Sequence, residues 1–397
     1  MDINFYTMPL PKYRVGQKIL IRQSDEYDKT SLTHGIILFP NITDNTYTVK
    51  IDATGGIDKV NETDIVHCDE FSPAQLRRPN IRIIFFGNGS FAVPTLRMLY
   101  EMGYDIAAVV TTPDKPKGRG RIIYPSDVKI CATEMGLDIL QPENLSDPEF
   151  LLYVKGLGAT LGVVVDFRIM PESLYSIPKY GTINLHCSLL PTFRGASPIA
   201  TAVREGYSVF GVTVFRLDDK IDNGDIILNC GANMEYTTAG YISSELALLG
   251  SRIMDRAILY LLNGYPLIPQ EDLRCRLFQP SMTRKISKTD CRIDWNKTAK
   301  EIYNHIRAYS SKPGAWTDLL FNSGISSTVR IFSAEPTSIP RGNHKIGTVF
   351  SAGKNIYAAC SDKLLKIQWL QMPGRKQNHA GDFINGMGGE FSATAIN

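Results

Sequence analysis

The sequence predicts a three-part protein in which a doubly wound α/β domain is flanked by two smaller domains built mainly of β-strands. With 397 residues, the chain is long enough for two or three domains that each bury a core. Continuous apolar runs alternate with helical stretches in the middle of the chain, as in a parallel sheet that helices cover on both faces. Short β-rich runs separated by turn-forming residues occupy both ends.

Residues 1–75 indicate the first of the β-rich domains. The runs "QKILIR", "HGIILF", "TYTVKID" and "TDIVHC" follow one another at intervals of about 8 to 12 residues, separated by turn-formers such as "TDN" and "TGG". This spacing predicts a small antiparallel barrel that loosely resembles SH3 and Tudor-like barrels. No motif in it names a ligand, so it is either a docking or stabilising module or a passive appendage. The segment "FSPAQLRRPN" predicts a linker.

Residues 80–270 indicate the α/β domain. The runs "IRIIFF", "DIAAVVTT", "LDILQP" and "ATLGVVVDF" are apolar without polar alternation, which is typical of strands buried on both faces. "GNGSFAVPTLRMLYEMG" predicts a turn and a helix, and "SDVKICATEMG" predicts a second helix. "GVTVFRLDDKIDNGDIILN" predicts a hairpin-like pair, and a long helix follows from Thr238 to about Leu262. A proline-containing connector ends the domain.

Residues 283–390 indicate the third domain, mainly a β-barrel. One helix, "KTAKEIYNHIRAYS", precedes short strands such as "VRIFSAEP", "KIGTVFSAG" and "LLKIQWLQM", and the final "FSATAIN" is expected to fray. Residues 271–397 hold 18 Lys and Arg against 10 Asp and Glu, whereas the rest of the chain is slightly acidic. This surplus fits either a surface that meets a polyanion or a merely basic, soluble surface.

Composition narrows the class of protein. A hydrophobic content of 43% and a charged content of 21% fit a soluble globular protein. The seven cysteines are scattered without a CxxC pair or a histidine cluster, so we expect neither a metal site nor a disulfide framework. No run approaches the roughly 20 apolar residues of a membrane helix, and the first residues lack a signal-peptide pattern. We therefore expect a cytoplasmic protein with no membrane partner.

A polar pair stands at the end of one predicted strand, in "GTINLHCSLLP". Residues two apart in a strand point to the same face, so Asn184 and His186 project together and Cys187 points away. A Cys-His nucleophilic pair is therefore disfavoured. The ends of strands in open α/β sheets are where ligands bind, and an amide and an imidazole there can donate hydrogen bonds to a developing oxyanion. The alternative is a buried polar pair that the backbone satisfies.

The segment "DDKIDNGD" offers a carboxylate that could approach His186. Its Asn-Gly is a strong tight-turn signal, so a structural turn role for Asp222 is a real alternative. A calcium-binding loop is a poor alternative for this segment, because aligning Gly224 with the loop glycine puts Ile221 at a ligand position. A carboxylate in this place could hold the tautomer of the imidazole and accept a proton.

The two segments together resemble the signature of the 10-formyltetrahydrofolate-dependent formyltransferases. In that family an N-x-H-x-SLLP segment and a later D-x-G-D supply the catalytic Asn, His and Asp, which match Asn184, His186 and Asp222. The resemblance runs from about Ile81 to Gly386. It implies a Rossmann-like catalytic domain, a C-terminal OB-like domain, and 10-formyltetrahydrofolate as the co-substrate that an amine attacks.

The resemblance also implies a folate site. The turn Ser188, Leu189, Leu190 and Pro191 would hold the folate, and the segment "VVDFRIMP" with Phe167, Arg168 and Ile169 would line the pterin pocket. Many relatives carry Tyr-Gly where this chain has Phe167 and Arg168. The alternative for this segment is the plain end of a buried strand.

The acceptor amine is indicated by the stretch "TTPDKPKGRGRIIYPSDVK". Lys115, Lys117, Arg119 and Arg121 lie within seven residues, interleaved with glycines that keep a loop flexible. The stretch resembles the basic inserted loop of the family members that formylate initiator methionyl-tRNA, and residues 284–317 resemble the start of their C-terminal domain. This implies a monomeric enzyme of translation initiation that binds tRNA through its last domain. The alternatives are a solvated loop and a sugar-nucleotide N-formyltransferase.

Two other classes compete. Gly87-x-Gly89-x-x-Ala92 after an apolar strand satisfies the dinucleotide fingerprint literally, although the acid that should support an NAD(P) site, Asp114, lies within a loop. The formyltransferase family shares this scaffold without binding a dinucleotide. A non-catalytic RNA-binding protein on the same scaffold is the other possibility, which the intact Asn184, His186 and Asp222 disfavour.

Overall fold

The computed structural model describes residues 10–24, 30–52, 54–68, 80–117, 122–274 and 279–396. The chain forms two compact units. The first comprises residues 1–195, 209–233 and 243–282, and the second comprises residues 196–208, 234–242 and 283–397. No helix among the described residues is long and apolar enough to cross a membrane.

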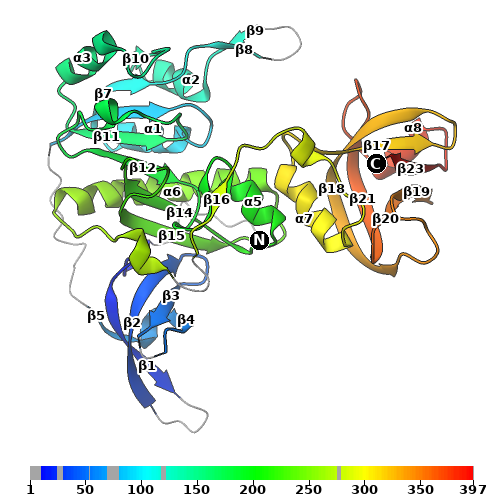
Figure 1. Cartoon of the computed structure of the whole chain (residues 1–397), viewed down its shortest axis with the longest axis horizontal. Coiled ribbons are helices and arrows are strands. Elements are labelled where there is room, and N and C mark those ends of the chain that lie inside the picture. Colours follow the sequence, from blue (N-terminus) through cyan, green and yellow to red (C-terminus); the bar gives the residue numbers. More distant parts are fainter. Residues whose placement is uncertain are drawn as a thin grey trace. The chain divides into compact units, whose positions relative to one another are not determined.

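The first unit is built on a long mixed sheet. Its parallel part has the order β10-β7-β6-β11-β12, and β14 and β15 continue it antiparallel (Figure 1). Residues 83–86 and 161–165 are almost fully buried, because helices cover both faces of these strands. The Rossmann-like α/β fold expected from the sequence is confirmed. The bounds are β6 Arg82–Gly87, β7 Asp105–Val110, β10 Ile139–Leu140, β11 Leu161–Val165, β12 Thr182–His186, β14 Val209–Arg216 and β15 Ile226–Asn233.

Two helices of this part begin at a side-chain cap. Ser126 and Asp147 each accept a hydrogen bond from the backbone N–H three residues on, at the starts of α2 and α3. The sequence analysis did not assign α3. The helical bounds are α1 Val93–Glu101, α2 Asp127–Glu134, α3 Pro148–Gly156, α4 Glu172–Tyr175, α6 Ala239–Leu262 and a 3₁₀ turn at Gln270–Leu273, with the short strands β13 Arg194–Gly195 and β16 Met282–Thr283. Helix α5, Pro198–Arg204, belongs to the second unit.

The N-terminal module is an antiparallel sheet in the order β5-β1-β2-β3-β4. It has its own core, which includes Ile19, Ile37, Tyr47 and Val49. One parallel bridge, from Asn41 to Gly231, joins β2 to β15. Residues 71–79 of the expected linker lie outside the described residues. The bounds are β1 Lys18–Ser24, β2 Thr30–Asn41, β3 Thr46–Ile51, β4 Ile57–Asn61, a 3₁₀ turn at Glu62–Asp64 and β5 Ile65–Cys68.

The second unit contains a closed antiparallel barrel. Six strands, in the order β18-β17-β23-β19-β20-β21, are closed by pairing of β18 with β21. Helix α7 starts with a capping box formed by Thr298 and Glu301 and packs on this barrel. The bounds are a 3₁₀ turn at Thr289–Cys291, α7 Ala299–Tyr309, β17 Ala315–Phe321, β18 Ser326–Pro340, β19 Thr348–Ala352, β20 Asn355–Ala359, β21 Lys363–Gln371, β22 Asn378–His379, α8 Ala380–Gly386 and β23 Ser392–Ile396.

The end of the chain corrects one expectation. Residues 392–396 do not fray but form β23, which pairs with β17 on one side and β19 on the other. Ala393 is 1% exposed. A single run of five residues is not stable as a strand on its own, so it forms because two neighbouring strands complete its hydrogen bonds.

Candidate active site

Strand β12 lies where the sheet changes direction. It pairs parallel with β11 and antiparallel with β14, where His186 faces Thr213. Asn184 and His186 therefore share one face at the carboxyl end of β12, as the strand periodicity predicted. His186 is buried, whereas Asn184 is half-buried. The structure records no hydrogen bond from the Asn184 amide to another described residue, so this amide is available to a ligand.

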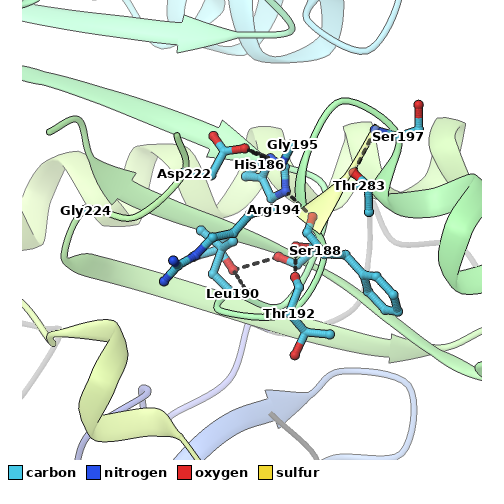
Figure 2. A network of polar contacts seen from close by, with 12 residues as sticks. His186, Ser188, Leu190, Thr192, Arg194, Gly195, Ser197, Asp222, Gly224 and Thr283 are labelled. Carbon is cyan, nitrogen blue, oxygen red and sulfur yellow. Dashed lines mark hydrogen bonds and ion pairs between the residues drawn. The ribbon is translucent and has the colours of Figure 1, made fainter. Parts of the chain in front are cut away.

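The two nitrogens of the His186 ring have different partners. Nε2 lies 2.9 Å from the carbonyl oxygen of Phe193, which can only accept a hydrogen bond, so Nε2 carries a proton. Nδ1 lies 3.6 Å from a carboxylate oxygen of Asp222, beyond an ordinary hydrogen bond. Figure 2 shows the carboxylate pointing toward the ring. Nδ1 is thus the ring nitrogen at which a proton can be gained or donated.

Asp222 reaches His186 because its turn is tightly constrained. Its φ is 49°, in the left-handed region, and a Cβ on Gly224 would lie 1.7 Å from the carbonyl oxygen of Arg216. The Gly195 backbone N–H donates to the Asp222 carboxylate at 2.8 Å. The Asp222 carboxylate thus contacts Gly195 through a hydrogen bond and His186 through an ion pair, and both partners lie outside its own turn.

A glutamine that the sequence analysis missed holds this turn. The Gln270 side-chain amide donates to the backbone oxygens of Asp222 and Gly224, at 2.9 Å each. Arg194 donates in turn to the Gln270 side-chain oxygen. Gln270 lies in the segment interpreted as a connector, and no local motif marks it. Only the folded chain brings it to the turn.

The loop after β12 is held by hydroxyl groups. Ser188 Oγ donates to the carbonyl of Thr192 at 2.7 Å, and Thr213 Oγ1 donates to the carbonyl of Ser188 at 2.7 Å (Figure 2). The backbone N–H of Leu190 donates to the same Thr213 hydroxyl at 3.1 Å. Desolvation, followed by the charge of Asp166, raises the pKa of the Cys187 thiol to about 12, which keeps it protonated and disfavours a nucleophilic role.

The segment after β11 has three different environments. The Phe167 ring packs on Phe86 with centroids 5.7 Å apart. The Arg168 guanidinium donates to the carbonyls of Pro142 and Glu143, so this side chain ties two loops together. The Ile169 side chain is 79% exposed. Where many relatives carry Tyr-Gly, this chain thus has an arginine that binds the backbone carbonyls of residues 142 and 143.

The glycine loop after β6 is occupied by a carboxylate of the protein itself. The Gly89 N–H donates to Asp166 at 3.1 Å, and a Cβ on Gly89 would lie 2.3 Å from that oxygen. Burial raises the pKa of Asp166, and the Gly89 hydrogen bond opposes this shift. A pyrophosphate on this loop would meet a carboxylate where a dinucleotide site offers free N–H groups, which argues against the NAD(P) alternative.

The two ends of the basic stretch pair as a hairpin, whereas the glycines that the sequence analysis expected to keep a loop flexible lie outside the described residues. Strands β8 Lys115–Lys117 and β9 Ile122–Tyr124 pair antiparallel, and we call residues 115–124 the basic arm. Lys115 is exposed, the side chain of Lys117 is not described, and Arg119 and Arg121 lie outside the described residues. The β-rich run "IIY" pairs with "KPK", a strand pair that the sequence analysis did not assign.

The base of the arm is fixed through Asp114. Its carboxylate accepts hydrogen bonds from Lys129 Nζ at 2.7 Å and from the Gln141 amide at 2.8 Å. The hydrogen bond from Lys129, followed by that from Gln141, lowers the pKa of Asp114. This acid is thus committed to the protein and is not free to bind a ribose. The described residues contain no group of three or more His, Cys, Asp and Glu arranged to hold a metal ion.

Comparisons with known proteins show the family of the chain. The formyl transferase family model matches residues 80–257, and the model of the formyl transferase C-terminal domain matches residues 285–388. A methionyl-tRNA formyltransferase of Porphyromonas gingivalis is 41% identical over 314 residues, which are 78% of this chain and 97% of that protein.

Solved structures share the fold at lower identity. HypX of Aquifex aeolicus in complex with tetrahydrofolic acid superposes with a TM-score of 0.52 at 17% identity, over 77% of this chain and 47% of HypX. The sugar 3N-formyl transferase WlaRD superposes with a TM-score of 0.52 at 19% identity, over 75% of this chain and all of that chain. Residues 1–79 precede both family matches.

Proposed function

The chain belongs to the methionyl-tRNA formyltransferase family, and we propose that Asn184, His186 and Asp222 carry out its reaction. The reaction transfers a formyl group to the α-amino group of the methionine on initiator methionyl-tRNA, for translation initiation. The formyl donor in our proposal is 10-formyltetrahydrofolate. The observation that carries the assignment is the Asp222 carboxylate 3.6 Å from His186 Nδ1, beside an Asn184 amide that bonds to none of the described residues.

The chemistry requires a stabilised oxyanion and a proton acceptor. The methionine amine attacks the formyl carbon, and the carbonyl electron pair moves to the formyl oxygen. An α-amino group has a reference pKa of about 7.7 to 8.0, so a useful fraction is neutral near pH 7 and no strong base is needed for the attack. The attacking nitrogen must then lose a proton, and N10 of the folate must gain one as its bond to the formyl carbon breaks and tetrahydrofolate leaves.

We assign a catalytic role to each side chain from the donor or acceptor atoms that the protein leaves available to the substrate. The Asn184 amide donates to the oxyanion, and a protonated His186 Nδ1 donates to it as well, because Nε2 is held by Phe193. The Asp222 carboxylate stabilises the imidazolium and takes up the amine proton directly, because Nε2 of the ring is held by the Phe193 carbonyl. Burial of both side chains strengthens these interactions, with 8% of His186 and 14% of Asp222 exposed.

The substrates would approach this centre from two sides. The loop Ser188–Pro191, fixed by Thr213, would hold the folate with its backbone groups, and residues 167–169 at the end of β11 would border the pterin. The basic arm would contact phosphates of the acceptor stem, which provides affinity without reading sequence. Relatives at 37–42% identity along most of their length favour the tRNA acceptor over the sugar-nucleotide alternative.

The test is formylation of charged initiator tRNA by single variants. His186→Ala and Asp222→Asn should each lower kcat by about 10² to 10³, the usual effect of removing an oxyanion-type interaction, while thermal unfolding stays near that of the parent. Asp219→Asn is the matched control, because Asp219 is an exposed carboxylate three residues from Asp222. Turnover of either active-site variant at the level of this control would contradict the assignment.

A further inference from the structure

The N-terminal module packs directly behind the proposed folate loop. Val15, Leu38 and Phe39 of the module share one buried cluster with Leu189 and Leu190 of the loop and with Phe215, Ile226 and Leu273. We propose that the module positions the Ser188–Pro191 loop for the formyl donor, with Phe39 as the positioning residue. This inference rests on the proposed role of that loop in folate binding.

A bulge in β2 aims Phe39 at the catalytic domain. The pairing of β2 with β3 shifts register between Ile37 and Phe39, so that Leu38 is an extra residue in the strand. Ile37 belongs to the module's own core, whereas Leu38 and Phe39 belong to the shared cluster. One strand thus serves two cores, and the change occurs at the bulge.

Two glycines facing each other across β14 and β15 make room for the contact. Gly211 pairs with Gly231, and residues directly opposite in an antiparallel pair point to the same face. A Cβ on Gly211 would lie 2.5 Å from Leu189 Cδ2. A Cβ on Gly231 would lie 2.8 Å from Phe39 Cδ2 and 3.5 Å from Leu189 Cδ1. Leu189 and Phe39 therefore fill one hollow over the two glycines.

The loop is consequently held by two kinds of contact. The Thr213 hydroxyl bonds to the backbone at Ser188 and Leu190. The side chains of Leu189 and Leu190 pack into the cluster to which the module contributes. Close packing transmits small displacements, so a change at Phe39 should move the loop backbone that we propose binds folate.

The module is fastened to the catalytic domain by polar contacts as well. The Asn229 amide donates to the carbonyl of Leu38 at 3.1 Å, and the Ile42 N–H donates to the carbonyl of Gly231 at 2.9 Å. The Arg14 guanidinium donates to the carbonyl of Pro266 and lies over the rings of Tyr260 and Tyr265. These contacts identify the module as part of the catalytic domain's packing, in contrast to a passive appendage.

The experiment compares two truncations on one strand of the full-length protein. Phe39→Ala and Ile37→Ala both remove a buried side chain of the module and should both lower the melting temperature. Only Phe39→Ala should also raise KM for 10-formyltetrahydrofolate, by roughly tenfold, because a small misplacement of binding groups is costly. KM for methionyl-tRNA should stay within about twofold in both, and Phe39→Leu should recover most of the lost affinity.

A second variant tests the same contact without truncating the module. Gly231→Ala inserts a methyl group between Phe39 and Leu189 and should raise the same KM, and combining it with Phe39→Leu should partly reverse the effect. Equal folate KM values in Phe39→Ala and Ile37→Ala, or an unaffected Gly231→Ala, would overturn the inference. Failure of the parent protein to formylate methionyl-tRNA would overturn the proposed function instead.

Discussion

The catalytic centre and the base of the basic arm each contain an aspartate held by a glutamine, but the two glutamines hold different atoms. Gln270 donates to backbone oxygens of Asp222 and Gly224 and leaves the Asp222 carboxylate to Gly195 and His186. Gln141 donates to the Asp114 carboxylate itself, which Lys129 also binds. Gln270 thus fixes the Asp222 turn and leaves the Asp222 carboxylate available for chemistry. Gln141 and Lys129 instead use the Asp114 carboxylate as a structural contact.

The two regions therefore need different things from the fold. The catalytic centre assembles residues from β12, the turn before β15 and the segment at 270, and a displaced atom there costs rate. The arm needs a fixed base and positive charge, because phosphate contacts depend on charge. Losses at the centre should appear in kcat, and losses at the arm should appear in KM for tRNA.

The sharpest comparison uses the two glutamines as matched variants. Gln270→Ala removes two hydrogen bonds at the Asp222 turn, each worth about 0.5 to 1.5 kcal/mol net, so kcat should fall about 10-fold with KM for tRNA little changed. Gln141→Ala removes support for Asp114, so KM for tRNA should rise a few-fold while kcat stays near the parent. Steady-state kinetics against both substrates measure the split.

A kcat loss in Gln141→Ala, in place of the expected rise in KM for tRNA, would contradict the different roles of the two glutamines. If Gln141→Ala lowered kcat as much as Gln270→Ala, the arm base would belong to the catalytic centre. Asp222→Asn in the Gln270→Ala background supplies a further check. If Gln270 is a positioning residue for Asp222, the two losses should be smaller together than their product.

Local patterns in the sequence predicted the strands and the polar face, because both follow from side-chain periodicity over a few residues. Asn184 and His186 stand two apart on β12, and the Asn-Gly turn puts Asp222 within reach. The clamp by Gln270 was missed because its partner lies 48 residues away and the segment has no regular pattern.

Contacts between distant segments also explain the other differences. The cluster that joins Phe39 to Leu189 depends on a bulge and a pair of facing glycines, and neither has a sequence signal of its own. Strand β23 forms between two neighbours that only the closed barrel supplies. Domain limits at 75, 80, 270, 283 and 390, a cytoplasmic location and a monomeric state stay predictions.

The arm itself gives the next largest effect. Lys115→Ala should raise KM for methionyl-tRNA about 3- to 10-fold and leave kcat unchanged, because the exposed Lys115 is proposed to contact phosphate. The slope of log KM against log salt should become shallower by about one for each phosphate that the variant no longer neutralises.

Arg119→Ala and Arg121→Ala should act alike, with Lys18→Ala, an exposed lysine of the N-terminal module, as the comparison. A salt slope near zero in the parent protein would instead favour a sugar acceptor.

The smallest expected effect is the pH dependence of stability at the arm base. Bonds from Lys129 and Gln141 lower the pKa of Asp114 on folding, so its contribution is present above its unfolded pKa, about 3.9, and is lost as the pH falls through the lower folded pKa. Because both side chains of the pair are partly exposed, solvent screens their attraction and the contribution is small. Asp114→Asn should therefore lower the melting temperature slightly at pH 7 and leave a difference that shrinks below about pH 4. A constant difference from pH 7 to pH 3 would show that the carboxylate charge is not what fixes the arm, and the contrast between the two aspartates would then rest on Asp222 alone.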